Sequence, residues 1–461
     1  MLALEFPAVL PYDSSPSEDV VRELAHAKRF LEYWSADPKF RQALPQDPEG
    51  VTAAAGLQAN PIELRPLWDP QGALDDPRPD SLILQRYRSF MREKLAYRDF
   101  LRSSAQSSHA GFRAWRQRQM NRCIGEMGAA KGSSLVHALM AVELCKGCSV
   151  GCWFCGISAL KLDGAWPYTE TNQQLWRGVL EAARDLLGAG CRRGFCYWAT
   201  DPLDNPDYEK FCTDFADQLG RFPQTTTAQP MRDPQRFREL HQLARRRGNE
   251  IDRFSILSLG MLKKVFAEYS AEELLFVELV MQMEGAYASK AFAGKARNQP
   301  ARWKKAFGED APPDYMTSTI ACVSGLLLRM PEQSFELITP TQADDRYPNG
   351  YRILARHSFD DAEEFRTKLK SVLDGLSARL PLDQPLRLRR DLRTTWKEGG
   401  AELVTHHLKI DVQDATLLRA LAEGGRTATA LALECEGQRS LEQTLLELNR
   451  LFSMGLLDEE P

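Results

Sequence analysis

Residues 145–156 read CKGCSVGCWFCG, and this stretch decides which kind of fold to expect. It carries four of the ten cysteines and follows directly on the apolar run 139–144. Cysteines crowded in this way are typical of metal ligation rather than of a disulfide scaffold. Cys148, Cys152 and Cys155 have the spacing C-x3-C-x2-C. Three thiolates on one short loop can ligate three irons of a [4Fe–4S] cluster and leave the fourth iron open.

A zinc knuckle is the alternative interpretation, with Cys145 and Cys148 as one pair and Cys152 and Cys155 as the other. Structural zinc sites usually separate their two pairs by about a dozen residues or more. Only three residues separate the pairs in this loop. The spacing therefore favours the iron–sulfur cluster, and Cys145 is expected to be a packed thiol, because a fourth protein ligand would close the open iron.

The composition excludes several other classes of protein. The 461 residues include 59 basic and 63 acidic side chains, for a net charge of −4, so no excess of positive charge points to nucleic acid. The first residues lack the basic and apolar regions of a signal peptide. No apolar run approaches the roughly 20 residues that span a bilayer. We expect a soluble cytoplasmic protein with no membrane or nucleic-acid partner.

The cysteine spacing, with the aromatic Phe154 before the last cysteine, resembles the signature of the radical S-adenosylmethionine (SAM) superfamily. The resemblance implies two cofactors, a [4Fe–4S] cluster held by Cys148, Cys152 and Cys155, and SAM bound at the open iron. It also implies a flavodoxin- or ferredoxin-type protein as electron donor.

Apolar runs alternate with amphipathic stretches through the middle of the chain. The strand candidates are 139–144, 194–199, 224–228, 254–259, 274–281 and 317–328, and helical patterns cover 174–187, 207–219 and 234–247. Such alternation predicts an α/β fold with a parallel sheet, either doubly wound or closed towards a barrel. With the superfamily resemblance, it predicts a partial (β/α)6 TIM-type barrel over residues 136–385, preceded by a helical region at 1–135.

The superfamily resemblance also assigns residues to SAM. The second strand of these enzymes usually ends in Gly-Gly-Glu-Pro, and this chain has Ala-Thr-Asp-Pro at 199–202. The register matches, but the glycines and the glutamate are absent. The residues expected to contact SAM are Phe154, Thr200, Asp201, Gln229, Ser255 and Ser258.

Residues 145–156 further resemble the loop of the polytheonamide-type (proteusin) peptide epimerases, and the likeness extends from about Glu143 to Pro340. This resemblance implies conversion of L- to D-residues in a ribosomally made precursor peptide consisting of leader and core. The 5′-deoxyadenosyl radical removes a Cα hydrogen, and a cysteine thiol returns hydrogen from the opposite face. C-methylation and cross-linking of a peptide remain alternatives within the superfamily.

Cys322 is the residue that we expect to return the hydrogen. It lies in the candidate strand 317–328, which we expect to be the last strand of the barrel and to open on its active end. Cys196 and Cys212 are competitors for this role. An inert cysteine in the core is the alternative.

Residues 386–461 predict a small α+β domain of the winged-helix kind. A strand at 403–410 is expected to precede a helix at 415–422, a glycine turn at 424–425 and two further helices. The pattern is similar to modules that recognise leader peptides. A generic winged helix that only packs on the barrel is one alternative. A zinc-stabilised winged-helix binding protein is the rival from outside the enzymes.

Overall fold

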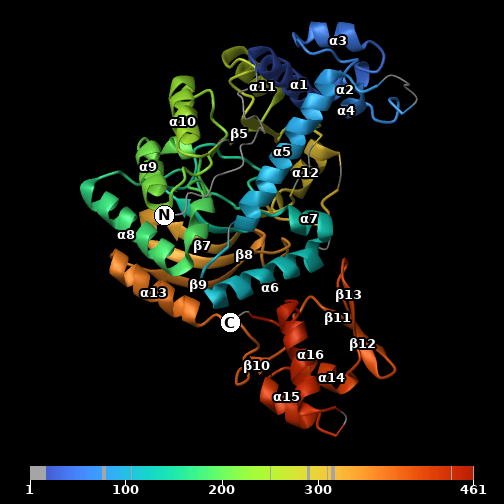
Figure 1. The fold of residues 1–461 in the computed structure, drawn as a ribbon, viewed down its shortest axis with the longest axis vertical. Coiled ribbons are helices and arrows are strands. Elements are labelled where there is room, and N and C mark those ends of the chain that lie inside the picture. The colour runs from blue at the N-terminus through green and yellow to red at the C-terminus, as the bar shows by residue number, and fades with distance from the viewer. Residues whose placement is uncertain are drawn as a thin grey trace.

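The computed structural model describes residues 17–74, 79–104, 106–249, 251–287, 291–308, 310–312, 317–437 and 439–459. Within these residues the chain is a mixed α/β protein with several separate sheets (Figure 1). None of the described helices is long and apolar enough to cross a membrane.

Helices make up the described part of the first 135 residues. They are α1 (Glu18–Ala36), α2 (Pro38–Ala43), α3 (Pro48–Ala54), α4 (Arg65–Trp68), α5 (Leu82–Ser104), α6 (Ala110–Met127) and α7 (Ala129–Ser134). Helix α1 begins at Ser17, whose side chain caps the free backbone N–H groups of the first turn. His109 caps α6 in the same way, because its ring accepts a hydrogen bond from the backbone N–H of Phe112.

The first sheet has the order β1-β7-β8-β9. Its strands are β1 (Ala138–Glu143), β7 (Val323–Arg329), β8 (Ser334–Pro340) and β9 (Tyr351–Ser358). Strands β1 and β7 are parallel, and the other neighbours are antiparallel. Gly325 allows β7 to approach β1, since a Cβ atom there would lie 2.0 Å from the carbonyl oxygen of Leu139. Both strands are buried along their length, which explains their continuous apolar sequences.

The second sheet is parallel and has the order β4-β5-β6. Its strands are β4 (Thr226–Thr227), β5 (Asp252–Ile256) and β6 (Val277–Met281). The helices that follow the strands or pack near them are α8 (Glu170–Leu187), α9 (Tyr208–Leu219), α10 (Pro234–Arg246), α11 (Leu259–Glu268), α12 (Pro300–Phe307) and α13 (Ala362–Asp374). The predicted strand 194–199 does not form a regular strand: Phe195 makes an isolated parallel bridge with Ala141 of β1, and the chain then bends and turns.

The order of the strands differs from the prediction of six consecutive barrel units. We expected the strand candidate 317–328 to come last in the barrel. The structure instead places β7 beside the first strand, and β6 pairs with β5 only among the described strands. Glycine at 325 permits this pairing, because a Cβ atom there would lie 2.0 Å from the carbonyl oxygen of Leu139. The parallel strands are therefore arranged as β7-β1 and β4-β5-β6, with the segment 195–198 beside β1.

The N-terminal helices share a hydrophobic core with the second sheet. Leu24 and Phe30 of α1 belong to the same buried cluster as Phe254 of β5 and Val277 of β6. Helix α1 also covers the outer edge of β6, where Lys28 Nζ donates a hydrogen bond of 2.8 Å to the carbonyl oxygen of Val277. An edge strand has backbone groups without strand partners, and α1 satisfies one of them here.

The C-terminal residues have a hydrophobic core of their own. The elements are β10 (Pro385–Leu386), β11 (Arg393–Lys397), β12 (Gly400–Val404), β13 (Lys409–Val412), α14 (Ala415–Glu423), β14 (Arg426–Thr427), α15 (Ala428–Glu434) and α16 (Leu441–Ser453). Strands β11-β12-β13 form an antiparallel sheet that precedes the three helices. The single predicted strand 403–410 was wrong: the hydroxyl of Thr405 accepts hydrogen bonds from the N–H groups of His407 and Leu408, and this turn separates β12 from β13.

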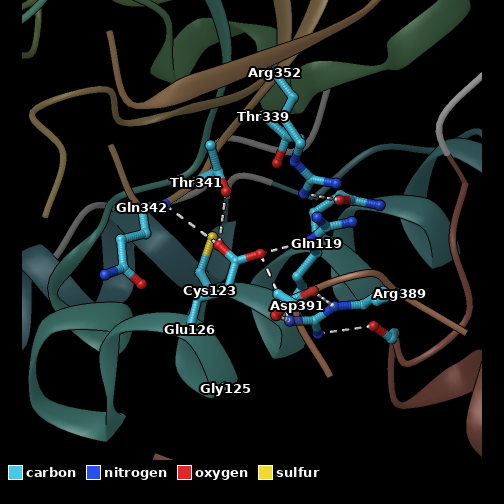
Figure 2. A network of polar contacts seen from close by, with 12 residues as sticks. Gln119, Cys123, Gly125, Glu126, Thr339, Thr341, Gln342, Arg352, Arg389 and Asp391 are labelled. Carbon is cyan, nitrogen blue, oxygen red and sulfur yellow. Dashed lines mark hydrogen bonds and ion pairs between the residues drawn. The ribbon is translucent and has the colours of Figure 1, made fainter. Parts of the chain in front are cut away.

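A buried polar network attaches this C-terminal unit, β10 to α16, to α6 (Figure 2). Glu126 of α6 accepts a hydrogen bond of 2.6 Å from Arg122 and forms an ion pair of 3.6 Å with Arg389. The Arg389 side chain is fully buried and also binds Asp391. Burial alone would raise the pKa of Glu126, but the surrounding arginines lower it to about 2. Glu126 is therefore a charged anchor between two arginines.

We expect Glu126→Gln to lower the free energy of unfolding by about 3 kcal/mol, because it removes the buried anion between Arg122 and Arg389, although Asp458 and Asp391 still pair with them. The stabilisation from Glu126 should be fully present above pH 4.5, the ordinary pKa of a glutamate, and should be lost as the pH falls towards 2. Urea unfolding at pH 7 and at several values below pH 5 measures both effects.

Asp391→Asn is the matched control, because Asp391 binds the same arginine from a partly exposed position. This variant should lose less than about 1 kcal/mol. Equal losses in the two variants would contradict the role of Glu126 as the buried anchor.

Candidate active site

A cavity of about 320 Å³ lies inside the curved arrangement of strands. The cysteine loop, the segment 195–201, β4, β5, α12 and the residues just before β7 all contribute to it. Its lining includes Cys148, Cys152, Phe154, Cys155, Tyr197, Thr200, Asp201, Thr226, Ser255, Gln282, Trp303 and Cys322. A larger cleft of about 490 Å³ lies between α6 and the C-terminal unit, and no cysteine lines it.

The cysteine loop is held at both ends by Asn205. The Asn205 amide donates hydrogen bonds of 2.8 Å to the carbonyl oxygen of Leu144 and of 2.9 Å to that of Trp166. Within the loop, the N–H of Cys148 donates to the carbonyl oxygen of Leu160. Residues 144–166 therefore form one folded-back loop that directly follows β1.

Asp204 fixes the middle of the same loop. Its carboxylate accepts hydrogen bonds from the backbone N–H and the hydroxyl of Ser149, at 2.9 and 2.6 Å. Arg232 pairs with this carboxylate at 2.9 Å. Gly147 has a φ of +84°, and a side chain there would meet the carbonyl oxygen of Lys161 at 2.3 Å. The fold of the loop thus requires glycine at 147.

The three cysteines of the C-x3-C-x2-C motif line the same cavity and are partly buried. Burial raises the pKa of Cys148, and burial raises that of Cys152 to about 11. The charge of Cys155 adds to both shifts, so the three sulfur atoms are close enough to repel one another as thiolates. Positively charged iron would relieve this repulsion, since metals bind the deprotonated thiol. These residues fit an iron–sulfur cluster.

Among the described residues, no three His, Cys, Asp or Glu side chains converge closely enough to ligate a single metal ion. In a [4Fe–4S] cluster each thiolate binds a different iron, so its ligands do not converge on one point. Three thiols spread over one wall of a cavity are therefore compatible with a cluster.

Aromatic side chains cover the cavity beside the cysteine loop. Phe154 lines the cavity and packs against Trp153, with ring centroids 5.6 Å apart. Trp303 and Phe307 of α12 line the cavity as well. The backbone of Gly294 lies against Cys155, where a side chain would come within 2.3 Å of the Cys155 carbonyl oxygen. These contacts exclude water from one side of the loop.

The structure brings four of the six predicted SAM contacts to the cavity and leaves two outside its lining. The four are Phe154, Thr200, Asp201 and Ser255. Gln229 instead donates a hydrogen bond of 2.9 Å to Ser149, and Ser258 caps α11 by accepting from the N–H of Met261. Both residues have local structural partners.

Asp201 lines the cavity, but its carboxylate is occupied by the protein. It accepts hydrogen bonds from the N–H groups of Leu203 and Ala228 and from the hydroxyl of Thr227. Burial raises its pKa to about 6 despite these bonds. Asp201 therefore ties the end of the segment 195–201 to the end of β4.

Cys322 lines the cavity at a different place from the one expected. It precedes β7 by one residue, and its carbonyl oxygen accepts a hydrogen bond of 2.8 Å from the N–H of Ala138. It therefore lies beside the beginning of β1, whereas the cysteine loop follows the end of β1. The competitors Cys196 and Cys212, like Cys145, are buried and do not line the cavity.

Asp204 and Asn205 are site residues that the sequence reasoning did not single out for a role. Both follow the Ala-Thr-Asp-Pro stretch, which had been aligned with the SAM-binding strand end. A usable signal existed, because Asp and Asn side chains bond readily to nearby backbone in turns. Their actual partners lie about 40 to 60 residues away in the sequence. No local sequence pattern indicates partners at such a distance.

The geometry defines a mixed α/β protein whose central cavity is lined by a three-thiol loop. No protein-family model matches the chain. It is 37% identical over 452 residues to the uncharacterized protein y4wI of Sinorhizobium fredii (strain NBRC 101917 / NGR234), covering 95% of this chain and 88% of the relative. The chain belongs to the same family as y4wI.

Among solved structures, BtrN in complex with AdoMet and 2-DOIA is similar over 52% of this chain and 87% of that chain. The sequence identity is 13% and the TM-score is 0.33.

Proposed function

We propose that this protein is a radical SAM enzyme that epimerises residues of a ribosomally made precursor peptide. The observation that supports the proposal most is the single cavity shared by the cysteine motif and the separate thiol of Cys322. The motif resembles that of the peptide epimerases, and their chemistry requires both a radical source and a hydrogen donor.

Cys148, Cys152 and Cys155 would hold the cluster. When bound, the cluster and SAM supply the radical that removes a Cα hydrogen. The chain's own residues supply the surroundings: Asp204 and Asn205 hold the loop, while Trp303 and Phe307 exclude water from the cavity. Exclusion of water protects a reactive carbon from side reactions.

Cys322 would complete the inversion. Removal and return of hydrogen must occur on opposite faces of a planar Cα radical. The cysteine loop and Cys322 reach the cavity from opposite ends of β1, which suits this requirement. Burial raises the pKa of Cys322 to about 11, so the group is a protonated thiol at neutral pH and carries the hydrogen atom to be transferred.

The D2O exchange experiment tests the function directly. The protein is co-produced in deuterated water with a candidate precursor peptide, and the peptide is analysed by mass spectrometry and chiral amino-acid analysis. Epimerisation should place one deuterium at the Cα of each D-residue and should add no mass in ordinary water. An added methyl group in the peptide would indicate methylation instead, and a loss of hydrogens would indicate cross-linking. Metal analysis of the isolated protein that finds zinc and no iron would indicate a binding protein instead of an enzyme.

We further propose that the C-terminal unit recruits the leader of the precursor. Strand β11 bonds only to β12 among the described strands, so its other edge can accept a peptide as an added strand. Trp396 on β11 is 44% exposed, and Arg419 lies over its ring at 5.2 Å. An exposed aromatic residue with a neighbouring arginine is the type of side chain that dominates binding energies.

We expect Trp396→Ala to weaken binding of the precursor about tenfold, because a docked leader would cover this ring. Fluorescence anisotropy of a labelled leader measures the affinity. Reductive cleavage of SAM should remain unchanged, as Trp396 is not in the cavity lining. The matched control is Leu382→Ala, which removes another exposed apolar side chain outside the β11-β12-β13 sheet. Unchanged affinity in the Trp396 variant would move leader recognition to another surface.

A further inference from the structure

A layer of polar residues that the proposed reaction does not use lies beside the inner part of the cavity, and Thr226 of this layer lines it. Thr226, Arg253 and Glu278 lie side by side on β4, β5 and β6, because the parallel register pairs Thr226 with Arg253 and Arg253 with Glu278. Side chains alternate along a strand, so Arg253 shares a face with Ser255, which lines the cavity. Both are half-buried, whereas their neighbours on β5 are fully buried.

The charges around this layer do not balance. Glu278 forms an ion pair with Lys94 of α5, and Lys28 pairs with Glu32 at 2.5 Å on α1. Within the described part of the chain, the Arg253 guanidinium has no ion pair and no side-chain hydrogen bond. Glu278 is an acid whose charge interacts with Arg253, but its carboxylate pairs with Lys94, so the N–H donors of Arg253 remain available to a ligand carboxylate.

Arg253 also lies near the proposed hydrogen donor. Burial raises the pKa of Cys322, and the positive charge of Arg253 acts against this rise. The same charge acts on Tyr197, which lines the cavity together with Cys322. Arg253 is therefore close to the inner part of the cavity. It precedes Ser255 by two residues on β5.

We propose that Arg253 binds a carboxylate of the substrate in the inner part of the cavity, beside Cys322. A guanidinium matches a carboxylate through two parallel hydrogen bonds, which would fix the orientation of the bound residue. The substrate class is then a peptide with a carboxylate, from an acidic side chain or the C-terminus, next to the residue that reacts. That the ligand is a substrate rests on the proposed function, whereas the presence of a carboxylate site does not.

Alkylation of Cys322 tests the site with defined probes. Iodoacetate carries a carboxylate and iodoacetamide does not, yet both alkylate a thiol by displacement of iodide. The cluster-loaded protein is labelled anaerobically with each, and the rate at Cys322 is followed by peptide mass spectrometry. The ratio of the iodoacetate rate to the iodoacetamide rate should exceed that of glutathione and should fall about tenfold in Arg253→Gln. The iodoacetate rate should saturate with concentration in the unmodified protein.

Two further variants control this test. Arg253→Lys keeps the charge but loses the two-bond geometry, so it should retain part of the preference for iodoacetate. Arg302→Gln removes an arginine that lies over Trp153 outside the cavity lining, and it should leave the ratio unchanged. The same ratio in the unmodified protein and Arg253→Gln would overturn the proposal.

Labelling in the presence of SAM separates the two sources of a carboxylate. SAM has a carboxylate of its own, and saturating SAM should leave the preference for iodoacetate intact if Arg253 serves the substrate. Loss of the preference with SAM would assign the site to SAM and overturn the substrate assignment. Synthetic peptides that end in a free carboxylate or an amide, with or without an internal glutamate, then compete with iodoacetate and distinguish the C-terminus from the side chain. None of these measurements depends on epimerisation.

Discussion

Replacing Cys148, Cys152 or Cys155 with alanine should abolish the reductive cleavage of SAM, with activity falling by at least about a thousandfold in each variant. Each substitution removes one of three thiols that line the same cavity, and an incompletely ligated cluster is lost or inactive. Iron and sulfide content, the absorbance of the anaerobically reconstituted protein and the yield of 5′-deoxyadenosine measure the effect.

Cys145→Ala is the matched control, since it removes a fourth cysteine from the same stretch. Cys145 is buried at the pairing of the short strands β2 (Cys145–Lys146) and β3 (Gly164–Ala165), and it does not line the cavity. This variant should keep its iron and its SAM cleavage. Loss of the cluster in Cys145→Ala alone would show that the ligand assignment is wrong.

Cys322→Ala should separate the two halves of the proposed reaction. The variant should still produce 5′-deoxyadenosine and remove the Cα hydrogen, because Cys322 is not part of the cysteine loop. Formation of D-residues should fall by at least about a hundredfold, since no thiol returns hydrogen from the opposite face. Chiral amino-acid analysis and deuterium incorporation in D2O give the two readouts.

Cys196→Ala provides the comparison, because Cys196 is a buried thiol of the neighbouring segment outside the cavity lining. It should keep full formation of D-residues. If Cys322→Ala also incorporates deuterium and forms D-residues at the normal rate, Cys322 has no part in the inversion.

Local sequence patterns predicted much of the secondary structure but not the spatial order of the strands. The runs that became β1, β5 and β6 were recognisable because buried parallel strands have apolar sequences. The position of β7 beside β1 was not predictable, since it depends on a contact between Gly325 and Leu139 across more than 180 residues. The turn at Thr405 was missed because apolar residues continue on both sides of it.

The sequence predicts those parts of the candidate site whose residues lie close together in the chain. Three cysteines within eight residues can be recognised as a motif from their spacing alone, whereas Arg253 is a single charged residue at the start of a strand. Only the register of β4, β5 and β6 places it beside Thr226 and on the same face of β5 as Ser255, both of which line the cavity. Gln229 and Ser258, which we expected to contact SAM, lie outside the cavity lining, since a strand end in the sequence does not reveal which side chains turn inward.

The contact between α1 and β6 has a consequence for synthesis of the chain. Lys28 and Val277 are 249 residues apart, so α1 leaves the ribosome long before the strand that it covers has been made. At 5 to 20 residues per second, roughly 10 to 50 seconds separate the two events. During this interval Leu24 and Phe30, which the finished protein buries completely, have no sheet to pack against. Until the second sheet emerges, the nascent N-terminal helices therefore expose apolar surface that the finished protein covers.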